Sequence, residues 1–412
     1  MHLVNPFKAL RPATGRASDI IAPPYDVLSS AEAIERAAGK PWSFLHISKP
    51  EIDLPAGTDV YSREVYAKAA ENLQKMLDAG VIVRDDQACY YVYRIIMGDH
   101  VQTGVVAAAS VIEYDNGRIK RHEFTRPDKE DDRVRQIEAL NAQTGPVFLA
   151  YPDAPAIDAV LGATVAGVPD ADATADDGIR HTLWVVRNTG TIEQLTKAFD
   201  ALPALYIADG HHRSAAASRV AASRRSANPH HSGDEGYNSF LSVIFPAHVL
   251  KIMDYNRVVT DLNGLSREEL IERISSAYDV SPSVSPVKPA VHGEVGMYVA
   301  GQWYRLNIKP GLIPADPVER LDVSLLTTHI LTPILGIADL RRDKRIDFVG
   351  GIRGLPGLEK RVNSGEMAVA FAMCATTMND LMSVADAGQV MPPKSTWFEP
   401  KLADGMASHV ID

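Results

Sequence analysis

The chain has 412 residues, of which 46% are hydrophobic and 23% charged, a composition typical of a globular protein with a large core. Its formal net charge of −10 gives no basic footprint for nucleic acid, so we do not expect a nucleic-acid partner. Only two cysteines occur, Cys89 and Cys374. This number excludes a disulfide framework and a CxxC metal site, and we expect both thiols to be buried because both lie in apolar runs.

The first residues show no signal-peptide pattern, and no uninterrupted apolar window of about 18 residues occurs. We therefore expect a cytoplasmic protein that does not interact with membranes. The length predicts two or three domains. We divide the chain into an N-terminal α+β region at 1–112, a core at 113–260 and a C-terminal α+β domain at 261–412. The fold class that we expect is α+β, with mixed and antiparallel sheets and packed helices.

The N-terminal region contains one rigid turn. Pro23 and Pro24 stiffen the backbone before Tyr25 and Asp26, which makes these two side chains candidate substrate contacts. An ordinary structural loop is the alternative. After this turn the pattern predicts a helix capped at Ser29, a strand over 44–48, an amphipathic helix over 61–79 and a β-hairpin formed by 89–97 and 101–112.

A charge-dense segment at 120–133 follows a predicted strand at 118–122. Most segments of this kind are simply charged residues on a surface exposed to solvent. Two features favour a functional role: the charges are mixed in sign, and a helix start follows, with apolar residues at helical spacing over 134–140. We expect polar side chains of this segment to contact a substrate, and the candidates are Arg121, His122, Arg126 and Lys129.

The central region alternates strands and helices. Thr144 and Gly145 precede a predicted strand at 147–151, and they could bring a hydroxyl and backbone N–H groups close to a ligand. Thr144 is therefore a candidate nucleotide or phosphate contact. A helix and a variable loop over 152–178, a strand over 181–186 and a helix over 191–201 follow.

The most informative stretch is 204–223. Residues 205–208 form an apolar run of strand length, and 214–223 are rich in alanine and favour a helix. Between them stand Asp209, Gly210, His211, His212 and Arg213. Glycine permits a tight turn and a close ligand, and the N-terminus of the new helix favours an anion. An Asp-Gly turn with surface histidines is the plain alternative, but the flanking elements favour a phosphate site with Asp209 as an acid or base at its edge.

The remaining third of the chain holds further candidates. We expect a polar loop over 223–236, whose His230 and His231 lack a helical i+4 partner and so do not indicate a metal site. Arg257 is a candidate phosphate contact in an apolar setting. A helix over 265–278, a hairpin over 296–306 and a helix over 323–335 should precede strands at 346–349 and 367–374 and a helix at 377–387. Near the C-terminus, a charge and two hydroxyls suit phosphate recognition, with a packed tail as the alternative; they belong to Lys394, Ser395 and Thr396.

The motif from Asp209 to Arg213 resembles the phosphate-binding motif of the ParB/sulfiredoxin superfamily, and its closest form is that of the free-serine kinases. The whole chain is similar to a bacterial and archaeal family known mainly as a domain of unknown function, DUF1015. The matching segments come in the family's order and span nearly the full length: 22–27, 121–130, 144–148, 208–213, 255–258 and 392–397.

This resemblance implies a ParB/sulfiredoxin-like core that binds nucleotide and phosphate. It implies phosphoryl transfer on a small hydroxy amino acid, serine or phosphoserine, in either direction, with ATP or ADP and with Mg²⁺. In the serine kinases an acidic residue after a histidine is the base on the serine hydroxyl, and His122-Glu123 resembles that pair. Glu123 is then the general base, and Asp209 positions the metal or polarises the nucleophile. A homodimer is compatible with the sequence.

Three other functions compete with phosphoryl transfer. The same motif could bind nucleotide as a switch or as a DNA-associated regulator, as in the ParB branch. The net charge and the absence of a helix-turn-helix pattern count against this reading. A metal hydrolase using the histidines lacks any trusted ligand spacing, so we assign no metal ligands. Sulfiredoxin activity is disfavoured because that motif has a cysteine where this chain has His211.

Overall fold

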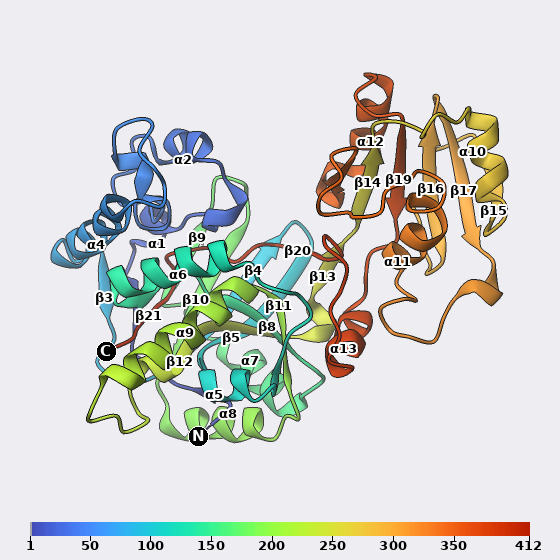
Figure 1. Ribbon diagram of the computed structural model, residues 1–412. Coiled ribbons are helices and arrows are strands. Elements are labelled where there is room, and N and C mark those ends of the chain that lie inside the picture. The colour runs from blue at the N-terminus through green and yellow to red at the C-terminus, as the bar shows by residue number, and fades with distance from the viewer. Residues whose placement is uncertain (1) are drawn as a thin grey trace. The chain divides into compact units, whose positions relative to one another are not determined.

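The computed structural model describes residues 2–412 and shows an α+β fold, as expected (Figure 1). The chain forms two compact units. The first runs to Leu250 and also takes up Pro400–Asp412, and the second is Lys251–Glu399. This division differs from the three regions that we expected from the sequence. The reason is strand pairing: the hairpin at 90–110, assigned to a separate N-terminal region, forms the middle of the same sheet as the central strands.

The main sheet of the first unit has nine strands in the order β6-β11-β8-β12-β5-β4-β10-β9, with β1 paired to β5. The pairs β11–β6 and β12–β8 are parallel and the others are antiparallel, so the sheet is mixed. The β4–β5 hairpin confirms the predicted one. The strands are β1 (Val4–Asn5), β4 (Tyr90–Met97), β5 (His100–Ser110), β6 (Ile119–Lys120), β8 (Val147–Tyr151), β9 (Ala171–Thr174), β10 (Arg180–Val186), β11 (Leu205–Asp209) and β12 (Ser239–Pro246).

Helices cover this sheet, and the largest core of the unit lies between them and the strands. Helices α6 and α9 lie side by side, because buried alanines such as Ala216, Ala217 and Ala221 let α9 approach its neighbours closely (Figure 1). This packing holds α6 beside α9, which matters for the site. The helices are α5 (Val111–Asp115), α6 (Pro127–Leu140), α7 (Pro155–Thr164), α8 (Thr189–Asp200) and α9 (His211–Ala227).

A second, smaller sheet of the first unit joins both ends of the chain. Its order is β3-β2-β21-β7, formed by β3 (Ile82–Arg84), β2 (Ala9–Pro12), β21 (Ser408–Val410) and β7 (Ala142–Gln143). The segment after Pro400 therefore returns into the first unit and is held there by strand pairing. The elements around this sheet are α1 (Ala17–Ile20), η1 (Tyr25–Val27), α2 (Ser30–Ala37), α3 (Leu45–Ser48), η2 (Pro50–Asp53) and α4 (Arg63–Asp78).

The predicted strand at 44–48 is wrong, because these residues form the short helix α3. Phe44, Leu45 and Ile47 are all buried. So short an apolar run is compatible with the periodicity of a helix and with that of a strand. The helical turn leaves His46 at the opposite side, where its ring contacts the Asp53 carboxylate at 2.9 Å. The cap at Ser29 is confirmed, and it forms a capping box with Glu32.

The second unit is built on a six-stranded antiparallel sheet in the order β15-β17-β16-β19-β14-β18. The predicted helix at 323–335 is only partly regular: its α-helical part ends at Leu326, and a π-helical turn follows before Pro333, which cannot donate a helical hydrogen bond. The elements are β13 (Lys251–Met253), β14 (Tyr255–Val259), α10 (Arg267–Ile274), β15 (Tyr278–Ser283), β16 (Glu294–Val299), β17 (Gln302–Ile308), α11 (Asp322–Leu326), β18 (Ile346–Gly350), α12 (Gly354–Asn363), β19 (Val369–Met373), α13 (Met378–Asp386) and β20 (Trp397–Glu399).

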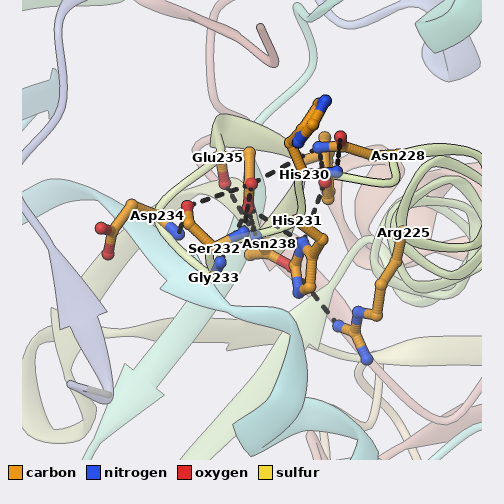
Figure 2. A network of polar contacts seen from close by, with 10 residues as sticks. Arg225, Asn228, His230, His231, Ser232, Gly233, Asp234, Glu235 and Asn238 are labelled. Atoms are coloured by element: carbon orange, nitrogen blue, oxygen red, sulfur yellow. Dashed lines mark hydrogen bonds and ion pairs between the residues drawn. The ribbon is translucent and has the colours of Figure 1, made fainter.

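The polar loop after α9 is tied together by one carboxylate (Figure 2). Glu235 accepts hydrogen bonds from the backbone of Ser232 and Gly233 and lies 3.0 Å from the His231 ring. The backbone donors lower the pKa of Glu235 to about 2. His231 therefore does have a carboxylate four residues on, in a loop rather than a helix. Cys89 is buried as expected, whereas Cys374 is only partly buried. Among residues 2–412 no helix is long and apolar enough to cross a membrane.

We predict that Gly104→Ala destabilises the first unit by about 1–3 kcal/mol, because overpacking a tight core costs this much. A Cβ at this position in β5 would lie 2.5 Å from the Ile244 carbonyl oxygen. Gly162→Ala in α7 is the matched control: its Cβ meets nothing within 4 Å, so the free energy of unfolding should rise by about 0.5–1 kcal/mol. Equilibrium urea unfolding measures both, and equal stability of the two variants would contradict the packing described.

Candidate functional site

The turn between β11 and α9 forms the centre of the candidate site. Strand β11 ends at Asp209, and α9 begins at His211. Gly210 between them has φ +99°, and a Cβ there would lie 3.1 Å from the Arg213 Nε. Only glycine fits this left-handed, crowded position without strain. The predicted strand, turn and helix are thus present, with the first N–H groups of α9 following Asp209 directly.

Two neutral imidazoles join the charge-dense segment to the start of α9. The His122 backbone N–H donates to His211 Nε2 at 3.4 Å, and the Arg126 backbone N–H donates to His212 Nε2 at 3.1 Å. The His122 ring also packs edge-on against the His211 ring, with centroids 4.5 Å apart. An imidazole accepts a hydrogen bond only when that nitrogen carries no proton. Burial lowers the pKa of all three rings, to about 4 for His122, which keeps them neutral.

Glu123 lies on the other side of His211. Because Nε2 of His211 accepts from the backbone, the ring proton belongs on Nδ1. That nitrogen lies 3.7 Å from Glu123 Oε2. The negative charge of Asp209 also acts on the same imidazole. The two carboxylates that the sequence singled out therefore flank one buried histidine, while the Glu123 side chain remains 55% exposed and accessible to a small molecule.

Asp209 is held by two cations. Lys401 Nζ lies 3.2 Å from one carboxylate oxygen, and Arg213 lies 3.7 Å from the other. Burial works to raise the pKa of Asp209, but these positive charges outweigh it and keep the pKa well below its usual range. Asp209 is therefore ionised at neutral pH. Lys401 was missed by the sequence analysis, because it follows the whole second unit and no local pattern marks it.

Arg213 connects this turn to two other predicted segments. Its guanidinium donates to the Pro146 carbonyl, next to Thr144 and Gly145, and lies 3.9 Å from the Asp26 carboxylate. Tyr25, beside Asp26, packs its ring 3.9 Å from the Arg133 guanidinium. The rigid turn at 25–26 and the Thr144 loop therefore both reach Arg213, as a shared site requires. Arg133 and the buried Asp404 belong to the same group of side chains, and neither was singled out from the sequence.

The other cations of the charge-dense segment lie at the surface. Arg121 packs its guanidinium 5.1 Å from the Tyr114 ring centroid. Arg126 pairs with the Asp128 carboxylate at 2.8 Å. Lys129 donates to the Tyr61 hydroxyl at 3.0 Å. These three side chains are exposed or partly exposed and lie on the same segment as Glu123.

Four of the predicted ligand contacts lie in the second unit, which we describe separately from the first. Arg257 is 1% exposed, and it donates to the carbonyls of Tyr255 and Lys394. Burial lowers its pKa to about 9. Its guanidinium therefore serves the packing of this unit. Ser395 donates to the Pro392 carbonyl at 2.7 Å, Lys394 lies over the Tyr255 ring, and Thr396 follows between these residues and β20.

No group of three or more histidine, cysteine, aspartate or glutamate side chains within 2–412 is placed to hold a metal ion. The carboxylates of the turn are instead paired with cations and histidine. What the arrangement offers is an ionised aspartate, an accessible glutamate and two cations at the start of a helix. Such a group can neutralise and orient a phosphate and can accept a proton at its edge.

The sequence matches the model of a family described as "Protein of unknown function (DUF1015)" over residues 4–324. The chain therefore belongs to this family, which confirms the resemblance inferred from its dispersed motifs. None of the curated proteins matches the sequence.

Several solved structures share a distant likeness with the chain. A free serine kinase in complex with AMP is 13% identical over 72% of this chain and 86% of that one, with a TM-score of 0.34. A conserved hypothetical protein from Pyrococcus furiosus is 15% identical over 76% and 98%, with a TM-score of 0.34. SbnI from Staphylococcus aureus, truncated at its C-terminus, is 9% identical over 73% and 85%, with a TM-score of 0.35. Such TM-scores are too low to define the fold or the activity of this chain.

We predict that stability falls as the pH drops from about 6.5 to about 4. In the unfolded chain His122 binds a proton near pH 6.5, whereas in the folded chain its pKa is about 4, so the unfolded state binds more protons in this window. Thermal unfolding between pH 7.5 and 4.5 should show this loss, and His122→Gln should make the slope shallower. Burial also lowers the pKa values of His181 and His409 to about 4. These two histidines therefore preserve part of the pH dependence of stability in the His122→Gln variant.

His230→Gln is the control for this measurement, because His230 lies exposed in the loop of Figure 2. Its pH profile should run parallel to that of the unchanged protein. Identical slopes for His122→Gln and the unchanged protein would show that His122 is not held neutral against the start of α9.

Proposed function

We propose that this DUF1015 member transfers a phosphoryl group to or from the hydroxyl of a small amino acid, with serine or phosphoserine as the substrate and ATP or ADP as the nucleotide. One observation carries the proposal: Glu123 and Asp209 flank the same imidazole at a helix N-terminus, where Arg213 and Lys401 supply positive charge. Phosphoryl transfer depends mainly on positioning and charge neutralisation, which this group offers. The choice of serine rests on the resemblance of the motif to the free-serine kinases.

The proposed phosphate position is the start of α9. The backbone N–H groups of His211 and His212 and the positive end of the helix favour an anion there. Arg213 and Lys401 add charge next to Asp209. The two histidine rings are engaged by backbone N–H groups, so we assign them the positioning of the charge-dense segment rather than direct phosphate contacts.

Glu123 is the proposed general base. Its exposure lets a substrate hydroxyl reach it, and the Nδ1–H of His211 helps to orient it. The hydroxyl oxygen attacks the γ-phosphorus of ATP, its proton moves to Glu123, and ADP leaves. In reverse, the phosphoryl group of phosphoserine passes to ADP or to water. Arg121, Arg126 and Lys129 are proposed substrate contacts on the same segment, together with Tyr25 and Asp26 near Arg213.

Mg²⁺ is the proposed companion of the nucleotide. In proteins Mg²⁺ is usually bound by one or two carboxylates together with substrate phosphates, and it keeps several waters. Asp209, ionised at the edge of the turn, suits this type of binding without a cage of three protein ligands. The ion would reduce the negative charge on the phosphates. The contribution of Lys394, Ser395 and Thr396 in the second unit stays a prediction.

The decisive experiment follows phosphorus NMR signals in mixtures containing Mg²⁺. Purified protein is incubated with phosphoserine and ADP, and separately with serine and ATP, ADP or pyrophosphate. Glu123→Gln should slow transfer at least about 100-fold, the usual cost of losing a general base. Asp209→Asn should abolish transfer because the paired cations Lys401 and Arg213 lose their anchor. Glu71→Gln, on the exposed face of α4, is the matched carboxylate control and should keep full activity.

The outcomes separate the alternatives. Free phosphate from phosphoserine alone would indicate a phosphatase. Nucleotide binding without transfer in any mixture would favour the nucleotide-binding switch, and a response of turnover to DNA would favour the DNA-associated regulator. Transfer that survives Asp209→Asn unchanged would contradict the site proposed here.

A further inference from the structure

Arg213 also lines a cavity of about 30 Å³ in the first unit. Three charged side chains line it: Arg133, Arg213 and Asp404. The polar part of the wall is completed by Tyr25, Ser48, Gln136, Gln143 and Thr144. A water-sized group needs roughly 10–15 Å³ of such space, so the cavity admits one end of a small ligand and excludes a nucleotide.

Asp404 presents an unsatisfied oxygen in this cavity. Its backbone is fixed by a two-way hydrogen-bonded bridge with Ala22, at 2.9 and 3.2 Å. Its side chain is buried, and Oδ1 has no hydrogen-bond partner among the residues that the structure describes. Gly145 closes the wall, because a Cβ there would lie 3.9 Å from this oxygen and 3.4 Å from Arg213 Cδ. A buried carboxylate oxygen without a donor is costly, so a donor from a ligand would be stabilising.

The charges around the cavity are short of one cation. Arg133 pairs with Asp132, Arg213 lies near Asp26 and Asp209, and Lys401 pairs with Asp209. With Asp404 ionised, four carboxylates thus face three cations. An anionic ligand would need Asp404 to stay protonated, and water would leave the charge uncompensated. A positively charged donor placed beside Asp404 offsets the charge of this carboxylate and satisfies Oδ1.

We propose that this cavity receives the ammonium group of a small α-amino acid, which donates to Asp404 Oδ1. This proposal rests on the proposed function, which supplies the substrate class. It adds the residue that recognises the amino group of that substrate. The guanidinium groups of Arg133 and Arg213 in the same wall suit the α-carboxylate of such a ligand, since arginine binds carboxylates in a paired geometry. A zwitterionic amino acid therefore offers its ammonium group to Asp404 and its carboxylate to the two arginines, and it leaves the net charge of the set unchanged.

Asp404 also gives this recognition a pH dependence. Burial raises the pKa of Asp404 to about 7; the charge of Asp26 adds to this effect, and Arg213, Arg133 and a side-chain hydrogen bond with Ser48 oppose it. The groups that face it are Tyr25 and Asp26 from η1, Ser48 from α3, Arg133 from α6 and Arg213 from α9. An ammonium group binds the ionised carboxylate, so the dissociation constant of the amino acid should rise up to about tenfold per pH unit below pH 7.

The test is calorimetric titration of the full chain at pH 8 without any phosphate donor, using L-serine and its deamino analogue 3-hydroxypropionate. We expect serine to bind more tightly than the analogue. Asp404→Asn should weaken the binding of serine at least tenfold and leave the affinity for the analogue unchanged. Glu71→Gln, whose carboxylate is exposed, pairs with Lys68 and does not line the cavity, should bind like the unchanged protein. A repeat in 100-fold excess KCl distinguishes an ammonium group from an alkali cation.

Equal affinity for serine and 3-hydroxypropionate, absence of serine binding, or displacement of serine by potassium would each overturn the proposal. If Asp404→Asn fails to fold, the pH series on the unchanged protein decides: serine affinity that is flat from pH 8 to 6 overturns it. Because no phosphate donor is present, this result is separate from the activity test. Serine binding that depends on Asp404 can stand without transfer, and transfer can stand when serine and its analogue bind equally.

Discussion

Two hydrogen bonds from backbone N–H groups to neutral imidazoles hold the candidate site together. His211 and His212 accept these bonds from His122 and Arg126, and they do so only while burial keeps their pKa values low. Together with the packing of α6 against α9 and the ion pairs of Arg219 with Glu130 and Asp131, they position the charge-dense segment at the start of α9. The arrangement brings Glu123 next to His211, and it explains why two adjacent histidines stand where phosphate ligands alone would need only backbone and arginine donors.

The site collects side chains from distant parts of the first unit. Arg213 lies at its middle, because its guanidinium reaches the 25–26 turn, the loop before β8 and the carboxylate of Asp209. The returning segment after Pro400 then adds Lys401, which pairs with Asp209, and Asp404, which lines a cavity together with Arg213. The small sheet in which β21 pairs with β2 and β7 fixes this segment. The first unit is therefore complete only with its last residues in place, although a whole second unit interrupts it in the sequence.

The parts of the site that the sequence predicts are those with a local pattern. The strand, glycine turn and alanine-rich helix around Asp209 were predicted because period, turn residue and composition agree within about twenty residues. Lys401 and Asp404 were not, since nothing within the C-terminal segment marks a lysine that pairs with an aspartate 192 positions earlier. Arg257 is a different case: a cation in an apolar run suggested a phosphate contact, and in the structure its guanidinium donates to carbonyls of its own unit. The short run at 44–48 fits helix and strand alike, and tertiary packing decided it.

We infer that an anion site lies at the start of α9 and depends on Arg213. Calorimetric titration with ADP in the presence of Mg²⁺ tests it most directly, comparing the unchanged protein with Arg213→Gln and with Arg225→Gln at the far end of the same helix. We predict that the unchanged protein and Arg225→Gln bind ADP with equal affinity and that Arg213→Gln binds at least tenfold more weakly. Equal affinity of all three proteins, or no binding by the unchanged protein, would contradict it.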